Sequence, residues 1–145
     1  MIIFGRMRKF STILFPAAAL FLACSQEDKP NTPSVLLDGR VSIHNQTSIP
    51  IKLLDFTQER GQTELTRVLD VRVYPMHQYR LINYLDGGSA EVFPGGDRVR
   101  IRFAAEAADP ENPGNPLFEN TVSLIINGNN TISVKNGGQY SVGPG

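Results

Sequence analysis

Three arginines at alternating positions, Arg98, Arg100 and Arg102, form the most distinctive polar pattern in the chain. In a β-strand this spacing places all three guanidinium groups on one face, about 6.8 Å apart at ~3.4 Å per residue. Such a row could bind an anion or an acidic partner surface. The alternative is a solvated face on which other strands supply acids such as Asp70 or Glu91. Both interpretations require residues 98–104 to form a strand.

Residues that could catalyse a reaction are few and poorly spaced. The sequence Gly-Gly-Ser-Ala-Glu at 87–91 approaches the nucleophile elbow G-x-S-x-G around Ser89, but Glu91 stands where the last glycine belongs. The two histidines, His44 and His77, are far apart and lack the spacing of a zinc site. Oxygen-bearing side chains at 109–115 match no calcium loop. The sequence therefore predicts no catalytic residue, no metal and no cofactor, and hence a protein that is not an enzyme.

The single cysteine, Cys24, ends an apolar run that follows the basic residues Arg8 and Lys9. The run at 13–23 would measure about 17 Å as a helix, too short for a hydrocarbon core of ~30 Å and suitable for a secretory signal. Ala23 precedes the cysteine, and a polar stretch follows it. A lone cysteine in an exported protein cannot form an intramolecular disulfide, and its position here favours modification.

The segment Phe21-Leu22-Ala23-Cys24 resembles the lipobox of bacterial lipoproteins. The resemblance implies that residues 1–23 are a signal peptide and that the Cys24 thiol is lipidated and becomes the new N-terminus. Ser25 then favours the outer membrane, and the acidic pair at 27–28 is similar to the export tag of surface-exposed lipoproteins in some Gram-negative bacteria. A periplasmic and a surface orientation both stay open, as do Met1 and Met7 as the first residue.

After the cysteine, the composition divides the chain into a linker and one domain. Residues 24–34 are predicted to be the lipidated N-terminus and a disordered linker, because 25–34 contains no apolar residue. Residues 35–145 are expected to form a single domain that its hydrophobic core stabilises without disulfides. Strand patterns recur about every ten residues, and no helical period is sustained. The predicted fold is all-β, a single antiparallel β-sandwich of about seven to nine strands.

Alternation within these strands predicts which side chains face the core. Val41 and Ile43 are expected inside, as are Val99, Ile101 and Phe103. In the strand at 51–57, Ile51, Leu53 and Asp55 are expected on one face, with Lys52, Leu54 and Phe56 on the other. Further strands are predicted at 65–74, 78–85, 90–93, 121–126, 131–135 and 139–142, and residues 105–116 are expected to be a loop with one helical turn.

The runs Leu-Asp-Gly-Arg-Val at 37–41, Pro-Ile at 50–51 and Tyr-Arg-Leu at 79–81 resemble the transthyretin-like, carboxypeptidase-regulatory-like domains of small lipoproteins. An immunoglobulin-like sandwich is equally allowed by the strand spacing. The resemblance implies a β-sandwich but no particular ligand.

Charge and composition exclude one class of partner. The chain carries 14 basic and 14 acidic residues, and three of the basic ones precede Cys24, so the remainder is net negative and nucleic-acid binding is not expected. The leading hypothesis is a lipid-anchored envelope protein with a non-enzymatic binding or scaffold domain, whose partner is an envelope protein or a glycan. The alternatives are a structural or adhesive subunit that pairs through a sheet edge, at 139–142 or 98–104, and a glycan-binding accessory lipoprotein.

Overall fold

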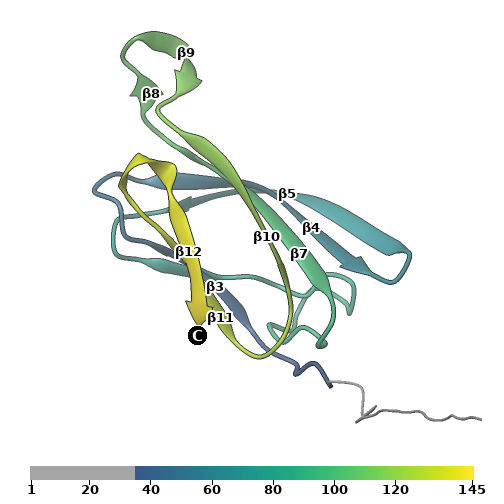
Figure 1. Cartoon of the computed structure of the whole chain (residues 1–145). Coiled ribbons are helices and arrows are strands. Elements are labelled where there is room, and N and C mark those ends of the chain that lie inside the picture. Colours follow the sequence, from purple (N-terminus) through teal and green to yellow (C-terminus); the bar gives the residue numbers. More distant parts are fainter. Residues whose placement is uncertain (1–34) are drawn as a thin grey trace, which may run out of the picture. The chain divides into compact units, whose positions relative to one another are not determined.

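The computed structural model describes residues 35–145, which form two four-stranded sheets and one two-stranded hairpin (Figure 1). The prediction of an all-β sandwich is confirmed. The strand labels follow Figure 1 and begin at β3. Cys24, the predicted signal and the predicted linker lie outside the described residues.

The first sheet has the strand order β10–β7–β4–β5, and all its neighbouring strands are antiparallel. β7 is hydrogen-bonded to β4 on one side and to β10 on the other. The prediction that residues 98–104 offer a free sheet edge was therefore wrong. The strands of this sheet are β4 (Ile51–Arg60), β5 (Thr63–Val73), β7 (Arg98–Ala105) and β10 (Glu119–Ile125).

The second sheet has the order β12–β11–β3–β6 and contains one parallel pair, β3 with β11. The other neighbouring strands of the two sheets are antiparallel, as the predicted antiparallel sandwich requires. Parallel neighbours need a long crossover connection, and here the whole first sheet lies between the two strands in the sequence. The strands are β3 (Val41–Asn45), β6 (Gln78–Arg80), β11 (Asn130–Val134) and β12 (Tyr140–Pro144), with the 3-10 turn η2 (Asn136–Gly138) before β12.

The order of the strands leaves the immunoglobulin-like alternative open. In variable-type immunoglobulin domains, a further strand extends one sheet, so two consecutive strands form a hairpin within that sheet. Here β4 and β5 form such a hairpin at the edge of the first sheet.

The core lies between the two sheets, and in β3 and β7 it follows the predicted alternation. Phe56, Ile101 and Val122 lie in register across β4, β7 and β10, and all three are buried. From the second sheet, β3 and β11 bury their apolar residues against them. The fully buried apolar side chains of β3, β7 and β11 are Val41, Ile43, Val99, Ile101, Phe103, Ile132 and Val134.

A β-bulge in β4 overturns the predicted facing of two residues. The register of β4 against both of its neighbours shifts between Leu53 and Asp55. An extra residue in a strand moves every later side chain to the opposite face, because the side-chain period is two. Phe56 therefore enters the core, and Asp55 lies on the outer face beside β7.

Two predicted strands are largely irregular. The strand expected at 78–85 ends after Arg80, and 90–93 contributes only isolated bridges, Asn83 with Ala90 and Gly39 with Phe93. The 105–116 connection has no helical turn. It forms the hairpin of β8 (Ala108–Asp109) and β9 (Asn112–Pro116), which projects from the sandwich in Figure 1.

Candidate functional site

Arg102 lies on the outer face of β7 between acids from both neighbouring strands. Its Nε and Nη2 atoms donate to Asp55 Oδ2 at 3.0 and 2.6 Å, and Nη1 donates to Glu119 Oε2 at 2.9 Å. These hydrogen bonds, with Asp55 the larger cause and Glu119 the next, raise the pKa of Arg102. The bulge that turned Asp55 outward has placed it opposite Arg102. This guanidinium is therefore already neutralised by two carboxylates.

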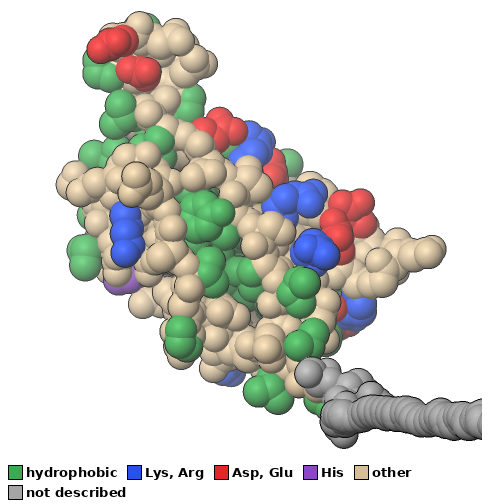
Figure 2. All heavy atoms as spheres, viewed as in Figure 1, with side chains coloured by type: hydrophobic (Ala, Val, Ile, Leu, Met, Phe, Trp, Pro, Cys, Tyr) green, Lys and Arg blue, Asp and Glu red, His purple; other side chains and the backbone are tan. Residues whose placement is uncertain are grey.

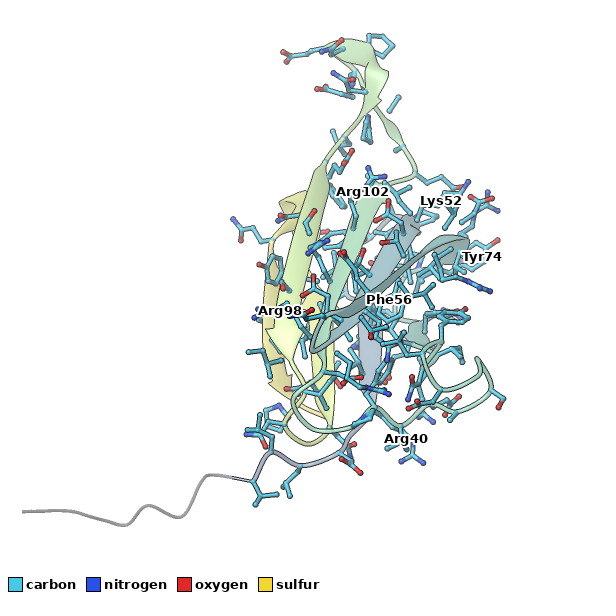
Figure 3. The ribbon with its side chains drawn as sticks, turned by 90° about the vertical axis from the view of Figure 1, so that its right-hand side faces the viewer. Arg40, Lys52, Phe56, Tyr74, Arg98 and Arg102 are labelled. Carbon is cyan, nitrogen blue, oxygen red and sulfur yellow. The ribbon has the colours of Figure 1, made fainter. Side chains whose placement is uncertain are left out.

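The other two arginines of the row make looser ion pairs. Arg98 lies 3.6 Å from Glu59, and Arg100 lies 3.6 Å from Glu59 and 3.8 Å from Glu64. All three arginine side chains are nearly half exposed. Figure 3 shows Arg98 and Arg102 spaced along the sheet. An anion that bound here would have to compete with carboxylates for each guanidinium, most weakly at Arg98.

The acids expected opposite the arginine row lie elsewhere. Asp70 pairs with Lys52 at 3.0 Å, and Glu91 pairs with Arg80 at 3.0 Å. A one-residue bulge and the strand order decide which acids face β7, and neither could be predicted from the alternation alone. Figure 2 shows blue and red side chains next to one another along this flank. This surface is therefore a set of ion pairs between the arginine row of β7 and acids of β4, β5 and β10. We call it the mixed-charge ladder; its residues are Arg98, Arg100, Arg102, Asp55, Glu59, Glu64 and Glu119.

A second polar cluster, which the sequence did not reveal, is buried under the segment 81–97. Gln58 of β4 donates from Nε2 to Asn83 Oδ1 at 2.8 Å and to Asp97 Oδ2 at 3.0 Å. Its Oε1 accepts from the backbone N–H groups of Tyr84 and Leu85. Gln58, Asn83 and Asp97 are each at most 2% exposed. Buried polar groups cost free energy unless they are hydrogen-bonded, and these are.

Arg60 closes this cluster at the surface. It donates two hydrogen bonds to Asp97, at 2.9 and 3.0 Å, and two to Asp86, each at 2.9 Å. The hydrogen bonds from Arg60, and next from Asn83, lower the pKa of Asp86. We call Gln58, Arg60, Asn83, Asp86 and Asp97 the Arg60 cluster. It ties the irregular segment 81–97 to β4, so its role is structural.

The outer face of the second sheet carries a shallow polar hollow of about 260 Å³. Arg40 and Arg80 flank it, and both lie near Glu91, at 3.9 and 3.0 Å. Hydroxyl and amide groups line the rest. The lining residues are Arg40, Ser42, Gln78, Arg80, Asn129, Asn130, Thr131 and Gly145. Such a hollow could take a small polar ligand, in keeping with the glycan alternative.

The residues considered for catalysis or metal binding do not converge. His77 Nδ1 lies 3.0 Å from the carbonyl of Pro75 in its own turn, and His44 lies on β3 beside Gln46. Ser89 lies in the irregular segment after β6. Within residues 35–145, no group of three or more potential metal-ligating side chains is found. In the same residues, no helix has the length and hydropathy needed to cross a membrane.

One predicted edge is present. β12 is the last strand of the second sheet, where the sequence predicted a strand at 139–142. Two hydrogen bonds flank the β11–β12 pair: Lys135 N donates to Gln139 O, and Gly145 N donates to Asn129 O. In an antiparallel pair, only every second residue is hydrogen-bonded to the partner strand. The odd-numbered residues of β12 are therefore the ones hydrogen-bonded to β11. The backbone groups of Tyr140 and Val142 therefore point away from the sheet. No charged side chain occurs in β12.

Comparison of the chain with protein-family models and with curated proteins finds no match. The sequence pattern around Cys24 and the geometry of residues 35–145 are the features that bear on function.

Proposed function

We propose that the chain is a lipid-anchored protein of the bacterial cell envelope whose β-sandwich binds another envelope component without catalysis. The observation that carries the proposal is the sequence at 21–24, a lipobox-like segment at the end of a short apolar run. A domain that begins near Val35 leaves ten residues, eight polar and two prolines, between it and Cys24. The lipid would fix the location, and these residues would give the domain its reach.

The domain supports binding rather than turnover. Its ionisable side chains are largely used for ion pairs and for the Arg60 cluster, and the polar hollow at Arg40 and Arg80 is shallow and open. We propose an envelope protein or a glycan as the partner, with the outer membrane as the location. For the domain we keep both descriptions, the transthyretin-like resemblance and an immunoglobulin-like sandwich.

Fractionation of a Cys24→Ala variant tests the anchor. The wild-type chain should stay with membranes at high salt and carry the added mass of a lipid at Cys24. The Cys24→Ala variant should move to the soluble fraction, and the matched Ser25→Ala variant should remain membrane-bound. A Cys24→Ala variant that stays on membranes at high salt would overturn the proposal. A pull-down from membranes with the lipidated protein then identifies what binds.

A second candidate function is a structural or adhesive subunit that pairs through a sheet edge. The observation that favours it is the uncharged edge of β12, with Tyr140 and Val142 exposed. Natural edge strands are usually protected by charge or by bulges, as β5 is by its bulge against β4. Sedimentation should show association that Val142→Lys abolishes and that Val68→Lys, at an exposed site on β5, preserves. A monomer at all concentrations counts against this candidate.

A further inference from the structure

We propose that the end of the sandwich that carries Val35, Leu36 and Leu37 lies against the bilayer in which the lipid at Cys24 is embedded. This inference rests on the proposed anchor and goes beyond it, because an anchor alone leaves the orientation of the domain open. We call Val35, Leu36 and Leu37 the N-terminal apolar segment. Figure 2 shows hydrophobic side chains at this end of the molecule.

The N-terminal apolar segment is exposed although its residues are apolar. Val35 is 81% exposed and Leu37 is 62% exposed. Exposed apolar side chains scattered singly are common on protein surfaces. Here three occur in succession at one end of the domain, with Val92 partly exposed next to Phe93, the bridge partner of Gly39. A contiguous exposed group of this kind indicates an interaction surface.

The domain holds this segment in a fixed place. Leu37 N donates to Asn127 Oδ1 at 3.1 Å, and Leu37 O accepts from Gly128 N at 2.8 Å. On the other side the segment lies on Gly95, where an added Cβ would come within 2.1 Å of Leu36 O. The side chains are therefore presented by the body of the domain, so contact at this segment would orient the whole sandwich.

The loops around the segment would allow a flat surface to approach. They consist of residues 93–97 and 126–129, whose one charged residue, Asp97, is buried in the Arg60 cluster. The mixed-charge ladder lies on the flank of the first sheet. Arg40 and Arg80 share Glu91 near this end, and the exposed Asp38 follows Leu37, so these four charges balance and none of one sign is left in excess.

The length of chain between the lipid and the domain favours the bilayer as the surface that contacts the N-terminal apolar segment. Ten residues separate Cys24 from Val35, and eleven peptide steps span at most about 40 Å. The tether therefore holds Val35, and with it the N-terminal apolar segment, within about 40 Å of the lipid. The opposite end exposes Met76, whose N–H bonds to Asn45 at the far end of β3. Met76 and the N-terminal apolar segment therefore lie at opposite ends of that strand.

Tryptophan quenching tests the orientation. The chain has one cysteine and no tryptophan, so residues 24–145, which include the complete described unit and its core, can be coupled at Cys24 to a maleimide phospholipid. The vesicles contain phosphatidylcholine, phosphatidylglycerol and brominated phosphatidylcholine. Leu37→Trp should be quenched several-fold more strongly than Met76→Trp, a control of matched exposure at 66%. Equal quenching, or stronger quenching at Met76, would overturn the proposal.

A partition measurement provides a second readout that needs no tryptophan. A single acyl chain coupled at Cys24 binds vesicles only marginally, so an added apolar contact is measurable. Leu37→Ser should lower the partition constant about tenfold, and Met76→Ser should change it by less than about twofold. Equal partition of the two variants would refute the contact. Because the lipid is attached chemically, failure here is distinct from failure of natural lipidation, which the fractionation of Cys24→Ala reports.

Discussion

Arg60→Met should destabilise the domain far more than the loss of an ordinary surface arginine. Arg60 donates four hydrogen bonds, two to Asp97 and two to Asp86. Asp97 is only 2% exposed. After the substitution its carboxylate keeps the hydrogen bond from Gln58 Nε2 but has lost its counter-ion. An uncompensated charge would then be left in the interior, at the point where the segment 81–97 joins β4.

The expected loss of stability follows from how deeply Arg60 and Asp97 are each buried. Removing one partner of a fully buried ion pair costs about 3–5 kcal/mol. The Arg60 side chain is 38% exposed, so water can reach part of the site and the lower limit applies, about 3 kcal/mol. For a domain of this size that corresponds to a fall in Tm of about 12 °C.

Equilibrium unfolding in urea, followed by far-UV circular dichroism, measures this loss. The matched control is Arg98→Met, which removes a surface pair at 3.6 Å and should cost less than about 1 kcal/mol. The double variant Arg60→Met with Asp97→Asn should be more stable than Arg60→Met alone, because the unpaired charge is gone. If Arg60→Met costs no more than Arg98→Met, the account of the cluster is refuted.

Three further predictions concern packing and titration. Gly39→Ala should lower the free energy of unfolding by about 2 kcal/mol or more, because the added Cβ would lie 2.0 Å from a carbonyl oxygen of the β10–β11 turn. The control Gly114→Ala, whose added Cβ meets nothing within 4 Å, should leave the free energy of unfolding unchanged in the same assay. The hydrogen bond from Arg60 lowers the pKa of Asp86. The stabilisation that the ionised Asp86 gives the folded domain is therefore present above the ordinary carboxyl pKa of about 4, and it is lost as the pH falls below that value. Arg60→Met should therefore flatten the acid limb of stability against pH. Burial raises the pKa of Tyr79, so the wild-type chain should show a late step in its tyrosinate absorbance titration, above pH ~10. That step should be absent in Tyr79→Phe. A wild-type titration without the step would contradict the assignment.

Some of the fold could be predicted because it depends on local pattern. Alternation of apolar residues with a period of two identified the buried faces of β3 and β7, including Val41 and Phe103. The same rule failed in β4, where one bulged residue moved Phe56 into the core. The strand expected at 78–85 also failed after Arg80, because side chains of the Arg60 cluster, and not a partner strand, hold the segment that follows.

The candidate site was predicted only in part. The spacing of Arg98, Arg100 and Arg102 indicated one sheet face, and the structure places them there. The identities of the facing acids, Asp55, Glu59, Glu64 and Glu119, depend on register and strand order. No local signal revealed the Arg60 cluster, because its members come from segments up to 39 residues apart.

The amino-acid sequence by itself determined that the domain is all-β, because strand periodicity and turn residues are local properties. The lone Cys24 after a short apolar run, which supports the proposed anchor, is equally a feature of local order. Tertiary structure decided the parallel pairing of β3 with β11, the partners of the arginine row and the fixed exposure of Leu37. Each of these depends on contacts between residues distant in the sequence, whose geometry exists only once the two sheets have assembled.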